Sequence, residues 1–307
     1  MSLARSLLLA ISDSRWMREH AVRWPFFRRA ASRFMPGEEL DDALAAGKAL
    51  GVGTVLTNLG ENLTSPEDAR QVRAHYLETL ERVHREKLDV EISVKLTQLG
   101  LDFSVEECEK NLHALIERAA ELSNWVWLDM EQTGYTEVTL EVYRRARQRF
   151  GNTGLCIQAY LYRTAEDLES LIALGSGVRL VKGAYREPPD KAYPKKSDVD
   201  ENFFRLATRL LSPEARQKGV RAIFGTHDPD LIRRIEEHAR SSGLAPKDLE
   251  FQLLFGIRRA EQLRLQGAGY RFRVLISYGR YWFPWYMRRL AERPANALFV
   301  LRNLFAR

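Results

Sequence analysis

Short apolar runs alternate with amphipathic segments along most of this chain. After residue 50 the same order repeats eight times: an apolar run, a polar or glycine-bearing end, then a segment with apolar residues at helical spacing. Most runs are nearly continuous rather than alternating, as expected of parallel strands buried on both faces. The runs occupy residues 52–59, 90–96, 125–130, 154–160, 178–185, 220–226, 249–255 and 272–278.

The intervening segments have the periodicity of amphipathic helices. They include residues 65–87, 104–122, 135–150, 165–174, 200–211 and 228–240. Because alternating strands and helices make a sheet parallel, eight repeats predict an α/β fold, a closed (β/α)8 TIM-like barrel. We expect residues 51–307 to form this catalytic barrel, with its final helix near the barrel mouth. Residues 1–50 are expected to form an N-terminal helical arm.

Length and composition fit a single globular barrel. The chain has 307 residues, 45% hydrophobic and 29% charged, and such barrels need about 250 residues. No apolar stretch approaches the roughly 20 residues of a membrane helix, so we expect a cytoplasmic protein or one peripheral on the inner face of the plasma membrane. Cys108 and Cys156 lie in helical and strand segments, which makes a disulfide or a metal site unexpected.

The net charge of +6 is concentrated in the first 37 residues. This arm has seven arginines against Asp13 and Glu19, so the rest of the chain is almost neutral. Its large apolar side chains suit a helix lying on an anionic membrane, but helices packed on the barrel with arginines in water would give the same pattern. Nucleic acid binding is not expected, because no basic stripe continues into the barrel. The apolar residues are Leu7, Leu8, Leu9, Trp16, Trp24, Phe26, Phe27 and Phe34.

Polar residues at the ends of the expected strands are the candidates for chemistry, because barrel active sites form there. They could equally cap helices or line a packed barrel. Lys95 and Lys182 interrupt apolar runs, where an unpaired lysine is costly. Each could form a Schiff base, bind an anion or make a structural ion pair. The position-based candidates are Lys95, Asp129, Gln158, Lys182, His227 and Gln252.

Two connections after strands carry further signals. Asp129 and Glu131 would point to one side if the third strand stays regular. After the sixth strand, Asp228 and Pro229 have the sequence of a helix N-cap and first turn, which leaves His227 on the rim.

The last helix places two arginines beside aromatic residues. Arg288 and Arg289 lie within three or four residues of Trp285 and Glu292. Such a pair could form a fork for a carboxylate while the aromatic rings cover an apolar ring. Arginines solvated on a surface helix are the alternative.

Seven motifs, taken together, closely resemble the flavin-dependent proline dehydrogenase family of the monofunctional bacterial type. Each is weak alone, but their shared order and spacing make the match specific. They span almost the whole chain: SVKLTQLG at residues 93–100, LDME at 128–131, QAY at 158–160, RLVKGAY at 179–185, TH at 226–227, EFQ at 250–252 and RRLAE at 288–292.

The resemblance implies an FAD cofactor held at the strand ends without a Gly-rich dinucleotide loop, which this sequence also lacks. Arg179 would approach the flavin ring, where a cation stabilises the negative charge of reduced flavin. Glu292 would support an arginine. Carried over by matching position, the cofactor contacts are Met130, Gln158, Arg179, Lys182, Gly183, Ala184, Tyr185, Thr226, His227 and Glu292.

The resemblance also implies the substrate and its site. L-proline would lose a hydride to the flavin and become Δ1-pyrroline-5-carboxylate, electrons would pass to a membrane quinone, and a pyrroline-5-carboxylate dehydrogenase would be the partner that receives the product. Glu61 matches a position that pairs with an active-site arginine and gates access. The substrate carboxylate would be held by Lys95, Arg288 and Arg289. Asp129 and Tyr185 would lie near the reacting ring. The catalytic residues would be Asp129 and Arg179.

Two positions depart from the family pattern. Leu275 and Trp285 stand where the family usually has tyrosines that wall the substrate ring. Hydroxyproline or another proline-like cyclic amino acid is therefore an alternative substrate. Alternatives of other classes are a Schiff-base lyase using Lys182 or Lys95 and a noncatalytic flavoprotein.

Overall fold

Eight parallel strands close into a barrel in chain order, β1 to β8, as the apolar runs predict. The computed structural model describes residues 31–60 and 63–291, with only the backbone at 288, 289 and 291. The strands are β1 Gly53–Asn58, β2 Val90–Val94, β3 Val126–Leu128, β4 Thr153–Gln158, β5 Gly177–Val181, β6 Arg221–Gly225, β7 Glu250–Leu254 and β8 Arg271–Tyr278. The longest register joins β1 to β8 over six residue pairs and closes the barrel.

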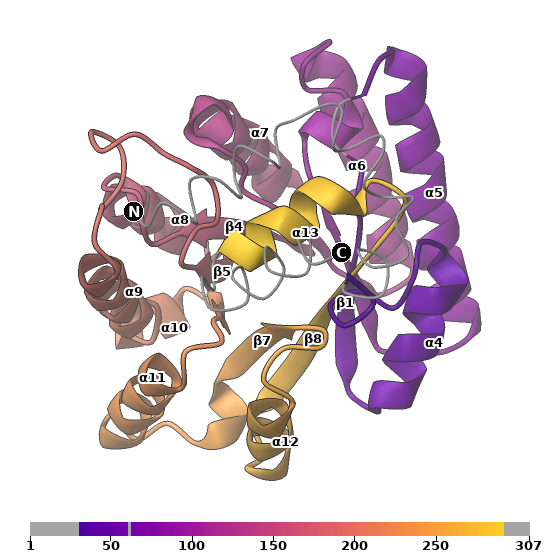
Figure 1. Ribbon diagram of the computed structural model, residues 1–307. Helices are drawn as coiled ribbons and strands as arrows, with labels where there is room; N and C mark the ends of the chain where they lie inside the picture. The colour runs from indigo at the N-terminus through magenta and orange to yellow at the C-terminus, as the bar shows by residue number, and fades with distance from the viewer. Residues whose placement is uncertain (1–30, 61–62, 292–307) are drawn as a thin grey trace, which may run out of the picture.

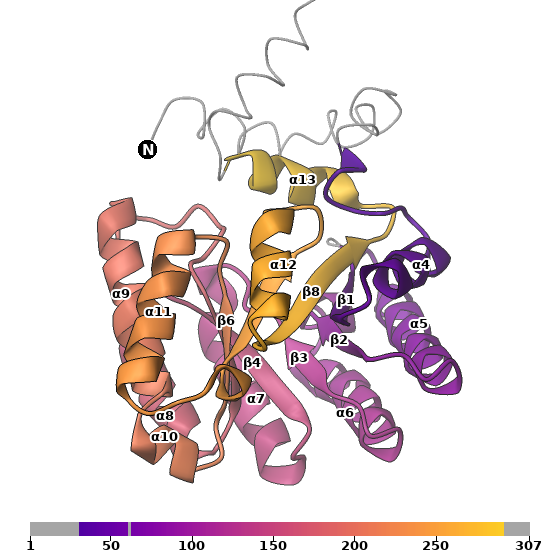
Figure 2. The same cartoon turned by 90° about the horizontal axis from the view of Figure 1, so that it is seen from below.

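Helices surround the barrel (Figures 1 and 2) and follow the strands in sequence. The periodicity located the longer ones to within a few residues. It missed α10 and α12, which are too short to display several turns of a pattern. The bounds are α4 Leu40–Leu50, α5 Pro66–Arg85, α6 Val105–Glu121, α7 Thr133–Arg149, α8 Thr164–Ala173, α9 Lys196–Leu210, α10 Pro213–Gln217, α11 Pro229–Ser241, α12 Arg259–Gly267 and α13 Trp282–Ala291, with short 3-10 turns η2 Thr97–Leu99 and η3 Pro246–Asp248.

Helix starts are fixed by capping side chains. Ser65 Oγ accepts the Asp68 amide at the start of α5 (3.3 Å), and Ser104 Oγ accepts the Glu107 amide at the start of α6 (3.2 Å). Asp228 caps α11 by accepting the Asp230 amide (3.2 Å), with Pro229 in the first turn. These caps satisfy amides that have no partner inside the helix, and the predicted N-cap at Asp228 is confirmed.

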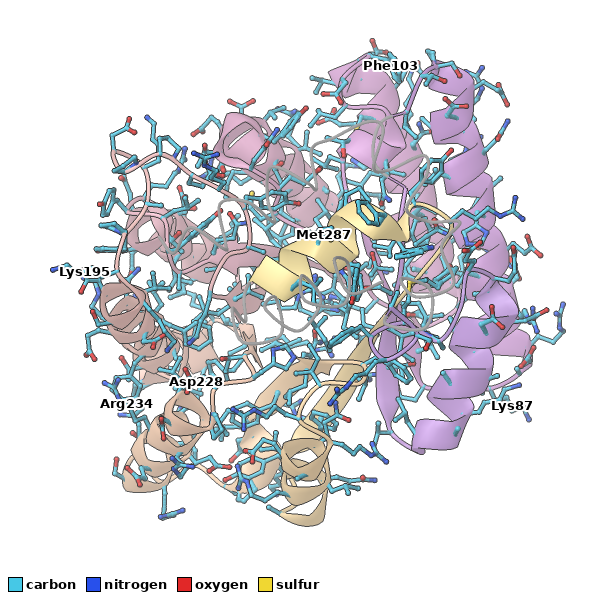
Figure 3. The ribbon with its side chains drawn as sticks, in the orientation of Figure 1. Lys87, Phe103, Lys195, Asp228, Arg234 and Met287 are labelled. Carbon is cyan, nitrogen blue, oxygen red and sulfur yellow. The ribbon has the colours of Figure 1, made fainter. Side chains whose placement is uncertain are left out.

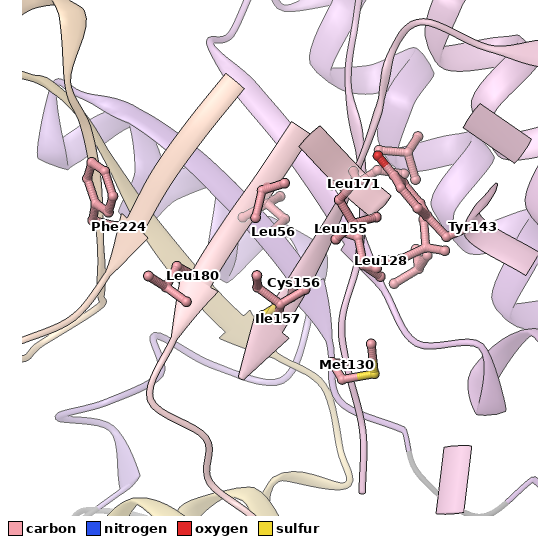
Figure 4. Close-up of a cluster of buried hydrophobic side chains, with 14 of the residues drawn as sticks. Leu56, Leu128, Met130, Tyr143, Leu155, Cys156, Ile157, Leu171, Leu180 and Phe224 are labelled. Atoms are coloured by element: carbon pink, nitrogen blue, oxygen red, sulfur yellow. The ribbon is translucent and has the colours of Figure 1, made fainter. Parts of the chain in front are cut away.

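The apolar core lies between the strands and the helices (Figure 4). Leu128 of β3 and Leu155 of β4 lie with Tyr143 of α7 and Leu171 of α8 among its fully buried members. Burying each leucine contributes about 1.5 to 3 kcal/mol relative to exposure. This layer accounts for the continuous apolar runs in the sequence.

The barrel interior is filled differently, by large aromatic and charged side chains. A Cβ at Gly154 would lie 2.3 Å from the Trp127 ring, and one at Gly177 would lie 2.7 Å from the Trp125 ring. Glycine is therefore needed on β4 and β5 to make room for the two tryptophans. The space inside the barrel is packed, not an open pore.

Ion pairs fill the amino end of the barrel. Arg221 makes two hydrogen bonds to Glu250 (3.0 and 2.9 Å) and lies 2.8 Å from Glu91. Trp127 Nε1 donates to Glu91 (2.7 Å), and Arg273 lies 3.3 Å from the same carboxylate. A cavity of about 750 Å³ opens here, beside Arg221 and Arg273. Both arginines already have carboxylate partners, so the cluster's role is structural.

Helix α13 crosses the barrel at the carboxyl ends of the strands, as Figures 1 and 2 show. The segment just before α4 packs against it: the rings of Phe34 and Tyr286 are 6.0 Å apart, and Trp282 Nε1 donates to Glu38 (3.2 Å). This end of the predicted arm thus packs on the barrel. Residues 1–30 lie outside the described part, so the arm as a domain stays a prediction. Within the described residues, no helix is long and apolar enough to cross a membrane.

Candidate active site

Three side chains, from β2, the end of β2 and β5, meet around Asp129, which follows β3. Arg179 of β5 donates to Asp129 Oδ1 and to Ser93 Oγ (2.8 Å), while Ser93 Oγ donates to the same Asp129 oxygen (2.9 Å). Lys95 Nζ lies 3.2 Å from Asp129 Oδ2. Arg179 is 2% exposed and Lys95 7%. The two predicted cations and the predicted carboxylate are therefore brought together, at the carboxyl ends of β2 and β3 and beside the middle of β5.

The charges of this cluster support one another. Burial alone would raise the pKa of Asp129, but Lys95 and Arg179 outweigh burial and lower it. Burial would lower the pKa of Arg179, but the surrounding groups, Asp129 first among them, together outweigh burial and raise that pKa. Asp129 is thus ionised at neutral pH and a poor proton acceptor. Lys95 also forms an ion pair with Asp129. The cluster therefore has two cations, Lys95 and Arg179, against one carboxylate, which suits it to binding an anion.

Two buried amides beside this cluster each leave one polar atom without a partner. Gln158 Nε2 donates to the Met130 carbonyl (3.3 Å), which leaves Gln158 Oε1 unpaired. Gln252 Oε1 accepts from Arg179 (3.4 Å), which leaves Gln252 Nε2 unpaired. Both glutamines are 3% exposed. Because a buried unpaired polar atom costs free energy, this acceptor and this donor fit a bound group that offers both functions.

A second charged cluster lies on the rim. Lys182 Nζ is 2.5 Å from Asp200 Oδ1 and 2.8 Å from Asp228 Oδ2, and Lys196 Nζ is 3.1 Å from the same Asp228 oxygen. Figure 3 labels Asp228 beside α11. The two lysines together lower the pKa of Asp228 although burial opposes them. Lys182 is therefore held in an ion-pair network, one of the three alternatives for a lysine in a strand.

The other predicted cofactor residues of β5 follow its end. Gly183 has a φ of +109°, and a Cβ there would lie 2.3 Å from the Tyr160 ring. Glycine is therefore required both by the backbone and by the aromatic neighbour. Ala184 and Tyr185, the next two residues, are partly exposed.

The remaining predicted cofactor residues lie on other strand ends. Met130 is 6% exposed beyond β3, and Thr226 is 3% exposed beyond β6. His227 Nε2 accepts the Leu254 amide hydrogen (2.8 Å), which requires that nitrogen to be unprotonated. The structure thus places these residues on the same barrel end as Asp129.

The two residues that depart from the family pattern lie in different surroundings. Leu275 of β8 packs in the interior against Val55, Trp127 and Ile223, and part of its side chain stays exposed. Trp285, on α13, is 8% exposed.

Some predicted site residues are not described by the structure. Residues 61, 62 and 292 lie outside the described chain, so the gate at Glu61 and the support from Glu292 stay predictions. Arg288 and Arg289 are on α13, but their side chains are not described.

Several side chains that take part in the two charged clusters have no role assigned to them from the sequence. Ser93, Asp200 and Lys196 were not candidates, and Gln252 was one by position only. Ser93 precedes the strand-ending Lys95 by two residues, so strand alternation could have placed both side chains inside the barrel. Glu131, by contrast, does not act with Asp129: β3 ends at Leu128, and Glu131 accepts hydrogen bonds from the Thr97 amide (3.3 Å) and hydroxyl (2.9 Å).

The chain is similar to known proteins of one family over most of its length. The family model for proline dehydrogenase matches residues 41–302. The chain is 37% identical to proline dehydrogenase 1 of Bacillus subtilis subsp. natto over 306 residues, covering 98% of this chain and 99% of that protein. It is 36% identical over 282 residues to proline dehydrogenase of Deinococcus radiodurans, covering 89% of each.

A solved structure agrees with these sequence matches. Proline utilization A from Bdellovibrio bacteriovorus, inactivated by N-propargylglycine, superposes with a TM-score of 0.81 at 25% identity. The match covers 96% of this chain but only 37% of that longer protein. The similarity to it therefore concerns one part of a larger molecule.

Proposed function

The chain belongs to the proline dehydrogenase family, and we propose that its oxidation of L-proline depends on FAD, yields Δ1-pyrroline-5-carboxylate and delivers electrons to a membrane quinone. The observation that carries the cofactor assignment is the pair of unpaired buried amide atoms, Gln158 Oε1 and Gln252 Nε2, beside Arg179. The pyrimidine edge of a flavin offers an N–H donor and carbonyl acceptors, the complement of these two atoms.

The cofactor contacts are proposed to be the strand-end residues that the family resemblance implies. Arg179 is a buried cation near the proposed ring position, where it would stabilise negative charge. FAD, when bound, supplies the acceptor for the hydride. The proposed contacts are Met130, Gln158, Arg179, Lys182, Gly183, Ala184, Tyr185, Thr226, His227 and Glu292.

Lys95, Arg288 and Arg289 would hold the substrate carboxylate. An ammonium carries three donors, so Lys95 can bind a carboxylate while it keeps its bond to Asp129. Asp129 would hold Lys95 and Arg179 in place as an ionised group rather than remove a proton. A substrate fixed by its carboxylate presents its ring C–H bond in one orientation, which makes the transfer nearly intramolecular. Tyr185 would lie beside the ring, and Glu61 would gate access.

Closure of the site would exclude water while the bond breaks. Helix α13, which crosses the strand ends with Trp282, Phe283 and Tyr286 at most 2% exposed, would form that cover. The secondary amine of the substrate must be neutral before the hydride leaves. We assign no base to this step, since Asp129 is already paired with two cations.

Hydroxyproline or another ring-substituted proline is a second candidate substrate. Leu275 is partly exposed in the barrel interior, and leucine leaves different space from the tyrosine usual in the family. Trp285, on α13, adds bulk where the family usually has tyrosine. The proposed pocket is therefore reshaped at two of its walls.

The proposed function is tested by what the purified protein contains and makes. Cofactor released by mild denaturation should be FAD by chromatography and mass. A panel of cyclic amino acids that includes L-proline should be assayed with a dye acceptor. L-proline should be oxidised, and o-aminobenzaldehyde should trap a pyrroline product. Colourless protein, or a borohydride-sensitive adduct with Lys95 or Lys182, would favour the Schiff-base lyase instead.

The quinone and the membrane contact form a separate part of the proposal. The arginine-rich residues 1–37, with a net charge of +5, would attract anionic lipid. We propose a cytoplasmic protein that binds the inner membrane face peripherally and passes its product to a pyrroline-5-carboxylate dehydrogenase. Cosedimentation of the full-length protein with anionic liposomes at low salt tests the contact, and failure to sediment would remove it.

A further inference from the structure

Three side chains that play no part in the proposed chemistry form a hydrogen-bonded cluster at the carboxyl ends of β1 and β8. His75 Nε2, on α5, lies 2.8 Å from the Tyr278 hydroxyl and 3.1 Å from Asn58 Nδ2. Asn58 Nδ2 can only donate, so Nε2 is the acceptor and the ring is neutral, and the Tyr278 hydroxyl then donates to the same nitrogen. Burial supports this assignment, because it lowers the pKa of His75 despite Glu78 and Glu39 nearby. We call these three residues the β1–β8 clasp.

The chain leaves β8 directly beside the clasp, through a tight contact with the residue that follows β1. The Leu59 amide donates to the Tyr278 carbonyl (2.6 Å). At Gly279 φ is +117°, and a Cβ there would lie 2.9 Å from the Leu59 carbonyl oxygen. Helix α13 begins at Trp282, four residues after Tyr278. The position of the α13 start therefore follows from that of Tyr278.

The same helix that supplies His75 also supports the charged cluster. The Tyr76 hydroxyl accepts the Asn58 amide hydrogen (2.9 Å) and donates to the Ser93 carbonyl (3.0 Å). Ser93 in turn bridges Asp129 and Arg179 through its side chain. Two adjacent residues of α5 thus contact the end of β8, four residues before α13, and the strand that carries Ser93.

We propose that His75 and Tyr278 are positioning residues for the substrate: they set α13, through the β8 end, against the strands that carry Lys95 and Asp129. The inference rests on the proposed role of α13 in holding the substrate carboxylate. A cluster that only closed the barrel between β1 and β8 would affect stability without selectively changing substrate affinity. The two roles therefore differ in what they predict for KM.

The test variant is Tyr278→Phe, which removes the hydroxyl and keeps the buried ring. The control is Tyr143→Phe on α7, another fully buried tyrosine, whose hydroxyl donates to the Thr153 carbonyl (3.3 Å) far from the clasp in sequence. Tyr278→Phe should raise KM for L-proline about fivefold, the worth of one hydrogen bond, with kcat within twofold and flavin content unchanged. Tyr143→Phe should leave KM unchanged even if it lowers Tm equally.

Partner variants and a second readout sharpen the result. His75→Leu should raise KM like Tyr278→Phe, His75→Gln should restore much of it because its amide oxygen can accept from Tyr278, and the double variant should be no worse than the poorer single one. Hydrogen exchange of residues 279–287 in the substrate-free protein should accelerate in Tyr278→Phe and not in Tyr143→Phe.

Arg289→Ala, measured alongside, separates this inference from the proposed function. If it raises KM while Tyr278→Phe changes neither KM nor exchange, the clasp has no positioning role and the carboxylate assignment survives. If neither substitution raises KM, the role of α13 in binding substrate fails, and this inference fails with it.

Discussion

Arg179 of β5 and Asp129, which follows β3, form an ion pair inside the barrel, and Ser93 of β2 is hydrogen-bonded to both. Three strands that are separated in sequence by more than thirty residues each are thereby tied together at one point. The arrangement holds a buried guanidinium in one orientation, with its carboxylate partner ionised. Predictions about this arginine therefore concern its geometry as much as its charge.

Arg179→Lys keeps the positive charge but cannot maintain the guanidinium bonds to Ser93, Asp129 and Gln252 at once. Losing charged hydrogen bonds worth about 1.5 to 3 kcal/mol should slow flavin reduction by roughly tenfold to a hundredfold. Stopped-flow absorbance under anaerobic conditions measures this rate. A rate equal to that of the unmodified protein would show that Arg179 does not act on the reacting group.

Arg288→Ala and Arg289→Ala should raise KM for L-proline while most of the flavin stays bound. A buried charged hydrogen bond contributes about 1.5 to 3 kcal/mol, so each should cost roughly tenfold to a hundredfold. Steady-state kinetics and the flavin absorbance of each purified variant give the two quantities. Unchanged affinity in both variants would rule out the carboxylate fork.

Leu275→Tyr should shift the ratio of kcat/KM values towards unsubstituted proline. Tyrosine would place a rigid ring and a hydroxyl where the leucine side chain is partly exposed, and so exclude a ring substituent. Such a pocket change is worth about 1 to 3 kcal/mol, or roughly tenfold to a hundredfold. The comparison uses L-proline and trans-4-hydroxy-L-proline with both proteins. An identical ratio would mean that residue 275 does not wall the substrate ring.

Asp228→Asn should lower stability at neutral pH, with the loss disappearing in acid. The folded-state pKa of Asp228 is lowered, so its contribution is present above the ordinary carboxyl pKa of 3.8 and is lost as pH falls through the folded value. Asparagine also caps helices, so the α11 cap survives. Urea denaturation from pH 7 down to about pH 2 follows the difference, which should be full above pH 3.8 and shrink progressively below it. Asp230→Asn, at an exposed carboxylate paired on the surface with Arg233, is the control and should show no such pH dependence.

The barrel could be predicted from the sequence because most strands are nearly continuous apolar runs followed by an amphipathic segment. The strand ends were located to within a few residues, and the strand-ending Lys95 and Asp129 with Arg179 could be named. The sequence pattern did not predict helix α12, because a helix of nine residues displays little periodicity. Asp228 was recognised as a cap, but its ion pairs with Lys182 and Lys196 were not.

Contacts between segments that are distant in the sequence account for most of the structure that local patterns could not predict. Tyr278 and His75 are 203 positions apart, and nothing local in either segment indicates that they meet. The same holds for Gln252 and Arg179. Local patterns report which face of an element is buried, whereas the pairing of polar groups across a barrel depends on register and tilt.

The central claim, a flavin site that oxidises proline at the carboxyl ends of the strands, is tested most directly by anaerobic titration of the purified protein with L-proline while flavin absorbance is followed. The account predicts that the oxidised flavin spectrum bleaches with about one equivalent of proline consumed per flavin, since a hydride carries both electrons. It also predicts slower bleaching in Arg179→Lys. Protein without bound flavin, or a flavin spectrum that L-proline leaves unchanged, would contradict it.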